Sequence, residues 1–269
     1  MTGLKRRNNV QVNGTGAVTL VFAHGFGCDQ NMWRTLAPNF QSRFRVLTFD
    51  LVGSGASDLT AYDYEKYNTL QGYADDLNEL ITEFADGPVI FVGHSVSAMI
   101  GLLADLSRPD LFLAHVMIGP SPCYISDADY LGGFTRADID SLLDALESNY
   151  LGWSSTMAPA IMGAPQQPEL AVELTNSFCR TDPDIAKHFA RVTFLSDNRA
   201  DLPKLKTSTL IIQCTDDLIA PQTVGDYLLR SIPNATLRLI ENVGHCPHLS
   251  APSACAASMD EFLLTLKLV

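Results

Sequence analysis

Basic residues are scarce in this 269-residue sequence: 18 lysines and arginines stand against 30 aspartates and glutamates, for a formal net charge of −12. That charge disfavours nucleic acid and anionic membranes as partners, and serves solubility. The sequence also lacks a signal peptide's charged-then-apolar layout, and no apolar run approaches the length of a membrane span. We therefore expect a cytoplasmic protein that binds neither nucleic acid nor membrane.

Paired cysteines are lacking as well. No C-x-x-C pair occurs among the six cysteines, so reduced thiols are expected. His245, Cys246 and His248 lie close together, but no second ligand cluster accompanies them, and we expect no metal site. The loop of small residues from Asp50 to Ser57 lacks the lysine of a P-loop and the glycine spacing of a dinucleotide site. No cofactor is therefore expected.

Residues 89–101 predict a strand, a sharp turn with a serine, and a helix. Gly93-His94-Ser95-Val96-Ser97 at the turn is typical of a nucleophile elbow, in which strain lifts the serine hydroxyl out of the backbone. Ser97 replaces the usual second glycine, and its small size should preserve the turn. The alternative is that Ser95 only caps a helix N-terminus, so the rest of the chain has to decide.

A second motif, His24-Gly25-Phe26-Gly27, follows an early buried strand. Alpha/beta hydrolases place an oxyanion donor at this point, because glycines let backbone N–H groups turn toward a substrate oxygen. A simple glycine-rich turn is the alternative. If the motif is functional, the N–H groups of Phe26 and Val96 form the oxyanion hole.

The remaining catalytic candidates follow late strands. Asp217, with Asp216 as the alternative, follows one strand, and His245, with His248 as its competitor, follows the last one. Histidine titrates near neutrality and can take the proton of a serine, while an aspartate fixes the imidazole tautomer. The order serine, aspartate, histidine is that of alpha/beta hydrolases. We therefore predict a triad of Ser95, Asp217 and His245.

Strand and helix patterns alternate along most of the chain, which favours an α/β fold with a mostly parallel central sheet and helices on both faces. Residues 69–85 form a clear amphipathic pattern, and a short helix is expected over residues 31–40. Buried strands are expected at residues 18–23, 44–49 and 89–92, and further strands at residues 115–118, 209–214 and 236–240. The prediction is an alpha/beta-hydrolase fold with a core domain of residues 1–125 and 198–269.

Residues 126–197 interrupt this alternation with four helical patterns, which prolines 159, 165, 168 and 183 are expected to break. We interpret this insertion as a four-helix lid. It has more apolar side chains than four short helices need among themselves, so some should line a pocket, although ordinary helix packing explains most of them. The substrate-binding candidates are His24, Phe134, Trp153, Met157, Phe189, Phe194 and Cys246.

Several motifs together resemble the branch of alpha/beta hydrolases that contains RsbQ and the karrikin and strigolactone receptors. The motifs are His24 to Gln30, Gly93 to Gly101, Gly132-Gly133-Phe134 and Asp217 to Pro221. Ser97 is similar to the karrikin-receptor side of this branch. Two further segments, Gly119 to Tyr124 and Gly244 to His248, are similar to the RsbQ side. The resemblance covers nearly the whole chain. It implies a hydrolase core, a four-helix lid and a closed apolar pocket over the serine.

The resemblance leaves two function classes open. One is a serine hydrolase that cleaves a small apolar ester or lactone, in a signalling context. The other is a receptor or regulator in which hydrolysis is slow, because bacterial members of the branch activate a partner phosphatase and plant members perceive butenolide-type ligands. The expected partners are therefore a small ester, lactone or butenolide-like ligand and, for the second class, a protein such as a signalling phosphatase.

Overall fold

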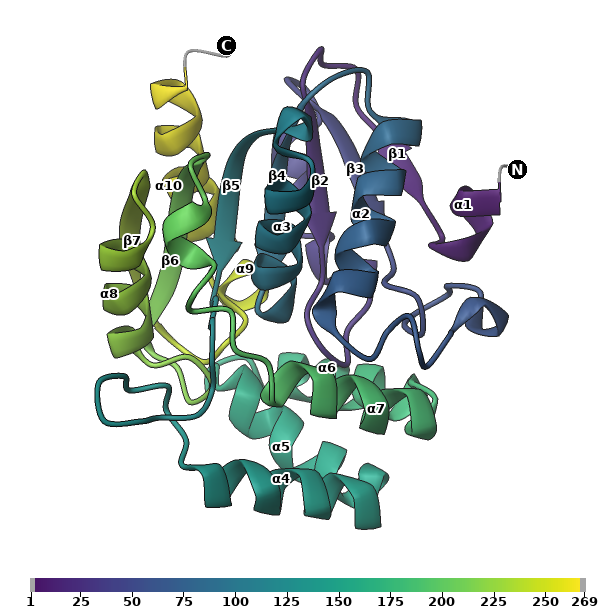
Figure 1. The fold of residues 1–269 in the computed structure, drawn as a ribbon, viewed down its shortest axis with the longest axis vertical. Coiled ribbons are helices and arrows are strands. Elements are labelled where there is room, and N and C mark those ends of the chain that lie inside the picture. The colour runs from purple at the N-terminus through teal and green to yellow at the C-terminus, as the bar shows by residue number, and fades with distance from the viewer. Residues whose placement is uncertain (1–2, 267–269) are drawn as a thin grey trace.

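A seven-stranded sheet with the order β1-β3-β2-β4-β5-β6-β7 forms the centre of the computed structural model, which describes residues 3–266 (Figure 1). The strands are β1 (Gln11–Asn13), β2 (Thr19–Ala23), β3 (Arg45–Phe49), β4 (Val89–His94), β5 (Phe112–Ile118), β6 (Ser208–Asp216) and β7 (Ala235–Val243). Only the edge strand β1 is antiparallel to its neighbour. The mostly parallel sheet is therefore confirmed. Residues 1–2 and 267–269 of the predicted core domain lie outside the described residues.

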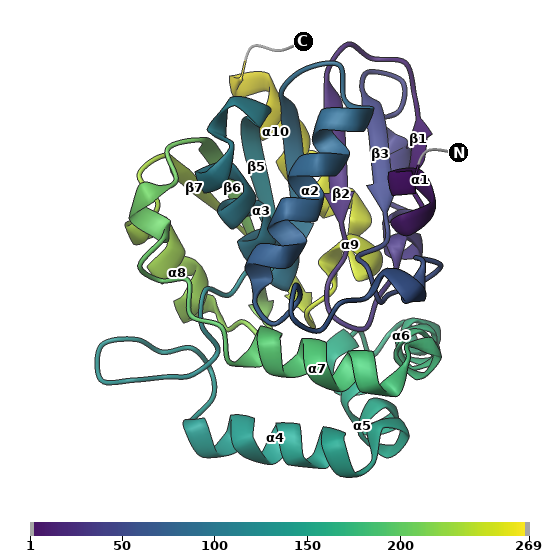
Figure 2. The ribbon, with the colours of Figure 1, turned by 45° about the vertical axis from the view of Figure 1, so that its right-hand side comes forward.

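Helices cover both faces of the sheet, as predicted (Figures 1 and 2). The helices beside the sheet are α2 (Leu70–Phe84), α3 (Val96–Ser107), α8 (Gln222–Ser231) and α10 (Pro252–Thr265), with the short α1 (Gly3–Arg7) and α9 (Pro247–Ser250) at its periphery. Side chains of a strand alternate between faces. In β2, Val21 packs in the core with α2, α3 and α8, whereas Leu20 and Phe22 pack in the core with α10. This two-sided burial explains why the central strands β2 and β4 are fully buried along their length, whereas the edge strands β1 and β7 are partly exposed.

Four helices between β5 and β6 form a separate layer at the end of the sheet toward which β5 points (Figures 1 and 2). They are α4 (Arg136–Ser148), α5 (Tyr150–Met162), α6 (Pro168–Arg180) and α7 (Pro183–Phe194). A third apolar core joins this α4–α7 layer to side chains at the strand ends, including Cys28, Tyr124, Ile219 and Cys246. The layer therefore packs over the edge of the sheet where parallel α/β sheets bind their ligands.

Two local predictions need correction. Residues 31–40 form two 3₁₀ turns, Gln30–Trp33 and Ala37–Phe40, instead of one helix, because Pro38 has no N–H to continue a helix across the gap. Pro159 does not break its helix but lies inside α5, where only one backbone hydrogen bond is lost near the end of the helix. Pro168 and Pro183 begin α6 and α7, a position that suits proline.

Within residues 3–266, no helix combines the length and the apolar character needed to cross a membrane.

Candidate active site

The turn between β4 and α3 places Ser95 in a strained conformation. Its φ of 56° and ψ of −124° lie in a region that non-glycine residues rarely adopt, as a nucleophile elbow requires. Small neighbours make the turn tight: a Cβ on Gly93 would lie 2.7 Å from the Ser97 carbonyl oxygen. Ser97, which replaces the usual glycine, donates a 2.5 Å hydrogen bond to the His24 carbonyl. This bond ties the elbow to the end of β2.

A chain of hydrogen bonds runs from Ser95 through His245 to Asp217. The Ser95 hydroxyl lies 2.8 Å from His245 Nε2, and His245 Nδ1 lies 2.8 Å from Asp217 Oδ2. The N–H groups of Ile219 and Ala220 donate to Asp217 Oδ1. Burial alone would raise the pKa of Asp217, but the charge of His245 and these hydrogen bonds outweigh it and hold the pKa below its ordinary value.

An ionised Asp217 can only accept hydrogen bonds. The proton between the two residues therefore belongs to His245 Nδ1, which leaves Nε2 free to accept the hydrogen bond from Ser95. This tautomer is the one that a general base needs.

The structure also places the two competing residues. Asp216 is exposed, and its backbone carbonyl accepts a hydrogen bond from Gly244. His248 is fully buried, and its ring lies 4.7 Å from that of Trp33, with no hydrogen-bond partner at either ring nitrogen. Only Asp217 and His245 are thus brought to Ser95.

The two expected oxyanion donors come from the residue after the serine and from the loop after β2. Val96 begins α3, so its N–H has no partner within the helix. Within residues 3–266, the N–H of Phe26 finds no backbone acceptor. Gly25 allows its loop to lie against the elbow, because a Cβ there would be 2.7 Å from His94 Nδ1.

A cavity of about 30 Å³ opens on Ser95. One water needs roughly 10–15 Å³ on this measure, so the cavity has room for about two or three waters. It is lined by Phe26, Cys28, His94, Ser95, Tyr124, Ile161, Leu174, Phe178, Thr193, Phe194, Ile219, His245 and Cys246. A groove of about 910 Å³ beside β1 is much larger but contains none of the triad candidates. The chemistry therefore points to the small cavity as the site.

Two of the predicted substrate-binding residues, Phe194 and Cys246, line this cavity. The other predicted residues are not part of the lining. Trp153 and Phe189 pack against the ring of Phe26, at centroid distances of 6.2 and 5.7 Å. Phe134 and Met157 are partly buried against the apolar core of the α4–α7 layer. His24 accepts a hydrogen bond from the Leu51 N–H through Nε2, so its ring braces the loop after β3.

Sequence reasoning missed Tyr124 as a site residue. It is buried beside Ser95, and burial raises the pKa of its hydroxyl to about 12, against the opposing effect of the Ser95 hydroxyl. Tyr124 therefore stays protonated and can donate a hydrogen bond near the serine. Its position soon after β5, at the same sheet edge as Ser95, was the available signal.

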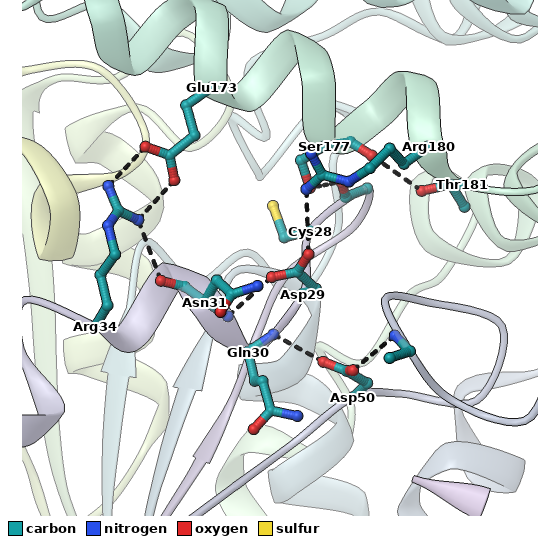
Figure 3. A network of polar contacts seen from close by, with 12 residues as sticks. Cys28, Asp29, Gln30, Asn31, Arg34, Asp50, Glu173, Ser177, Arg180 and Thr181 are labelled. Atoms are coloured by element: carbon teal, nitrogen blue, oxygen red, sulfur yellow. Dashed lines mark hydrogen bonds and ion pairs between the residues drawn. The ribbon is translucent and has the colours of Figure 1, made fainter. Parts of the chain in front are cut away.

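The α6 helix is fastened to the loop that carries Phe26 (Figure 3). Ser177 donates a 2.9 Å hydrogen bond to the Gly27 carbonyl, and Arg180 lies 3.3 Å from Asp29. The terminal guanidinium nitrogens of Arg34, Nη1 and Nη2, each lie 2.6 Å from an oxygen of the Glu173 carboxylate. These ion pairs are largely exposed and so contribute little energy, but they fix the position of α6 over the oxyanion loop.

Comparison with known proteins agrees with this geometry. The profile of the family described as "Alpha/beta hydrolase family" matches residues 20–258. The karrikin insensitive 2 receptor CA of Petunia hybrida is 39% identical over 250 residues, which cover 93% of each chain. The strigolactone esterase D14 of Arabidopsis thaliana is 38% identical over 249 residues, 92% of this chain and 93% of that protein.

Among solved structures, a hydrolase from Oleispira antarctica superposes with a TM-score of 0.94 at 42% identity, covering 97% of this chain and 96% of that one. The expected fold and the resemblance to the karrikin- and strigolactone-receptor branch are therefore confirmed.

Proposed function

Because the chain belongs to the alpha/beta hydrolase family, we propose that it is a serine hydrolase that cleaves a small apolar ester or lactone through Ser95. The observation that carries the proposal is the pair of 2.8 Å hydrogen bonds that links Ser95, His245 and Asp217 at a buried cavity. Serine is a poor nucleophile until a base takes its proton, and this arrangement supplies the base.

In the first step, the Ser95 oxygen attacks the carbonyl carbon while its proton moves to His245 Nε2. The resulting imidazolium is stabilised by the carboxylate of Asp217, which the lowered pKa keeps ionised. The N–H groups of Phe26 and Val96 donate to the developing oxyanion. The tetrahedral intermediate then collapses as His245 gives its proton to the departing oxygen, which leaves an acyl group on Ser95.

In the second step, His245 takes a proton from a water molecule that attacks the acyl carbonyl. Collapse of the second intermediate returns the proton to Ser95 and releases the acid. For a lactone, both products are parts of one hydroxy acid. The neutral Tyr124 hydroxyl next to Ser95 is placed to donate a hydrogen bond to a substrate oxygen during either step.

We further propose that the α4–α7 layer is the lid of this site and that residues 126–197 form the lid insertion. The layer contributes Ile161, Leu174, Phe178 and Phe194 to the cavity, which favours compact apolar substrates. The six cysteines are free thiols, in keeping with a reducing compartment such as the cytoplasm.

Substitution of the nucleophile tests the proposal. Ser95→Ala should reduce hydrolysis of p-nitrophenyl butyrate to the uncatalysed rate, because no covalent intermediate can form. Ser155→Ala is the matched control: its exposed hydroxyl bonds only to the Leu151 carbonyl within α5. Undiminished turnover in a folded Ser95→Ala protein would reject the assignment.

A ligand receptor with slow hydrolysis is the second candidate, favoured by the 39% identity to a karrikin receptor. In that case binding should shift the α4–α7 layer, which requires that the ligand bind one arrangement better than another. Trp153, whose ring stacks on Phe178 at 5.8 Å, should report the shift by fluorescence. A Trp33→Phe background isolates the signal, because these are the only two tryptophans. If a saturating concentration of a butenolide leaves the fluorescence spectrum and the melting temperature unchanged, the plain esterase is favoured. Kinetics over multiple turnovers also separate the two classes, because an esterase turns over rapidly and a receptor hydrolyses slowly.

A further inference from the structure

Thr193 on α7 has a buried hydroxyl with no hydrogen-bond partner among residues 3–266. The residue is 1% exposed, and its Oγ1 is among the buried polar atoms that find no donor or acceptor. Most buried polar groups in proteins are hydrogen-bonded, because an unpaired hydroxyl loses its interaction with water without compensation. An exception beside a candidate active site calls for an explanation.

Several other hydroxyl residues within the helices are satisfied by their own helix, and Ser97 and Ser177 bond to carbonyls of neighbouring segments. Ser154 donates to the Tyr150 carbonyl at 2.8 Å, Thr175 to the Ala171 carbonyl at 2.8 Å and Thr82 to the Asn78 carbonyl at 2.7 Å. This bond to the residue one turn earlier is the usual solution for a helical serine or threonine. Thr193 does not make it with Phe189, so its hydroxyl remains available to another group.

A ligand in the cavity at Ser95 could supply the missing hydrogen-bond partner of the Thr193 hydroxyl. Thr193 is one of its lining residues. It is also the only hydroxyl-bearing side chain that the α4–α7 layer contributes to the lining, and its neighbour Phe194 is apolar. The reacting serine and the Tyr124 hydroxyl lie on the core side of the same cavity. A ligand that fills the cavity therefore has Thr193 among its neighbours from the α4–α7 layer.

We propose that Thr193 is a specificity-determining residue that hydrogen-bonds a second oxygen of the substrate, away from the scissile carbonyl. The inference rests on the proposed ester or lactone hydrolysis and narrows its substrate class. The substrate is a compact ester or lactone that also carries an ether, carbonyl or hydroxyl oxygen. A threonine hydroxyl is both donor and acceptor, so it can pair with each of these. An ester or lactone whose other groups are all hydrocarbon leaves the hydroxyl unpaired in the complex.

Pairs of substrates with the same shape test the proposal. In the acyl half, p-nitrophenyl methoxyacetate replaces one CH₂ of p-nitrophenyl butyrate by oxygen. In the alcohol half, 2-methoxyethyl butyrate does the same relative to butyl butyrate. The measured quantity is kcat/KM of the oxygen-containing substrate divided by kcat/KM of its hydrocarbon counterpart. This ratio is compared between the wild type and the variants, so that the intrinsic reactivity of the esters cancels.

Thr193→Val should lower this ratio about five- to tenfold for at least one pair, the effect of one neutral hydrogen bond, by slowing the oxygenated substrate alone. Thr193→Ser keeps the hydroxyl and should retain the wild-type ratio. Without substrate, Thr193→Val should melt close to the wild type, because the hydroxyl bonds no group of the described protein and the two side chains have nearly the same shape. Unchanged ratios for both pairs, or a lowered melting temperature with equal losses for both members of each pair, would overturn the proposal.

A binding arm separates this inference from the proposed reaction. Ser95→Ala should bind β-hydroxy-γ-butyrolactone more tightly than β-methyl-γ-butyrolactone, and Thr193→Val in that background should remove the preference. If the wild type hydrolyses no ester but this preference is present, the hydrolase function fails and the role of Thr193 stands. If esters are hydrolysed but both the ratios and the preference are insensitive to Thr193, the role of Thr193 fails alone.

Discussion

The hydroxyl of Ser177 on α6 donates a 2.9 Å hydrogen bond to the carbonyl of Gly27, one residue beyond the proposed oxyanion donor Phe26. Phe178 on α6 packs against the same loop, and its ring centroid lies 5.8 Å from that of Phe26. The proposed lid and the proposed oxyanion hole therefore share one junction. A change at this junction should affect stability and turnover together.

Gly27→Ala should disturb this junction. The φ of Gly27 is +69°, and an added Cβ would lie 2.4 Å from the Phe178 ring. Overpacking and a left-handed alanine together should cost about 2–4 kcal/mol of unfolding free energy, and kcat/KM should fall as the Phe26 N–H moves. Gly87→Ala is the control, because a Cβ there meets no atom within 4 Å. Equal melting temperatures and activities for the two variants would contradict the prediction.

Asp217→Asn should cost far more activity than Asp216→Asn. Only Asp217 contacts His245, and an asparagine there no longer fixes the imidazole tautomer, so kcat should fall about 10³- to 10⁴-fold. The exposed Asp216 uses its backbone, and its amide variant should stay within about twofold of the wild type. Steady-state kinetics with p-nitrophenyl butyrate provide the measurement. A reversed ranking would move the acid to Asp216.

Acyl chain length should limit the rate. The cavity of about 30 Å³ should accept acetyl and butyryl esters faster than long acyl esters. Phe194→Ala removes a large lining side chain, so the optimum should shift toward hexanoyl and octanoyl esters. A series of p-nitrophenyl esters measures both effects. Wild-type preference for acyl groups of twelve or more carbons would indicate an open cleft instead.

The protein should lose stability in mild acid because two histidines are buried uncharged. Burial lowers the pKa of His94 to about 3 and that of His248 well below its ordinary value. The unfolded chain, with histidine pKa near 6.5, takes up protons that the folded chain excludes. Stability is therefore complete above about pH 6.5 and falls below it, by about 1.4 kcal/mol per pH unit for each histidine, until the folded pKa is reached.

Urea unfolding between pH 8 and pH 4.5 measures this slope. His248→Phe keeps a ring against Trp33 and His94 but removes one titrating group, so its slope should be shallower and its stability at pH 5 relatively higher. The same slope in the variant and the wild type would show that His248 is not the acid-sensitive group.

The sequence by itself determined the local elements. Continuous β-branched runs predicted the buried strands, and 3.6-residue periodicity predicted α2 within one residue at each end. The elbow could be read because its requirements, small residues around one serine, are local. The catalytic candidates could also be predicted, because each follows a parallel strand and therefore lies at the same edge of the sheet. Patterns of this kind depend only on neighbours along the chain.

Only the tertiary structure decided which side chains meet. Asp216 and Asp217 are adjacent, and β6 and the turn after it expose one and bury the other against His245. Trp153 and Phe189 were predicted to line the pocket. In the structure both rings contact Phe26, which lines the cavity, and neither residue is part of the lining. Tyr124 and Thr193 became visible as site residues only when distant segments were brought together. The physical reason is that a cavity is bounded by contacts between residues far apart in the sequence, whereas composition and periodicity report only that a side chain is buried.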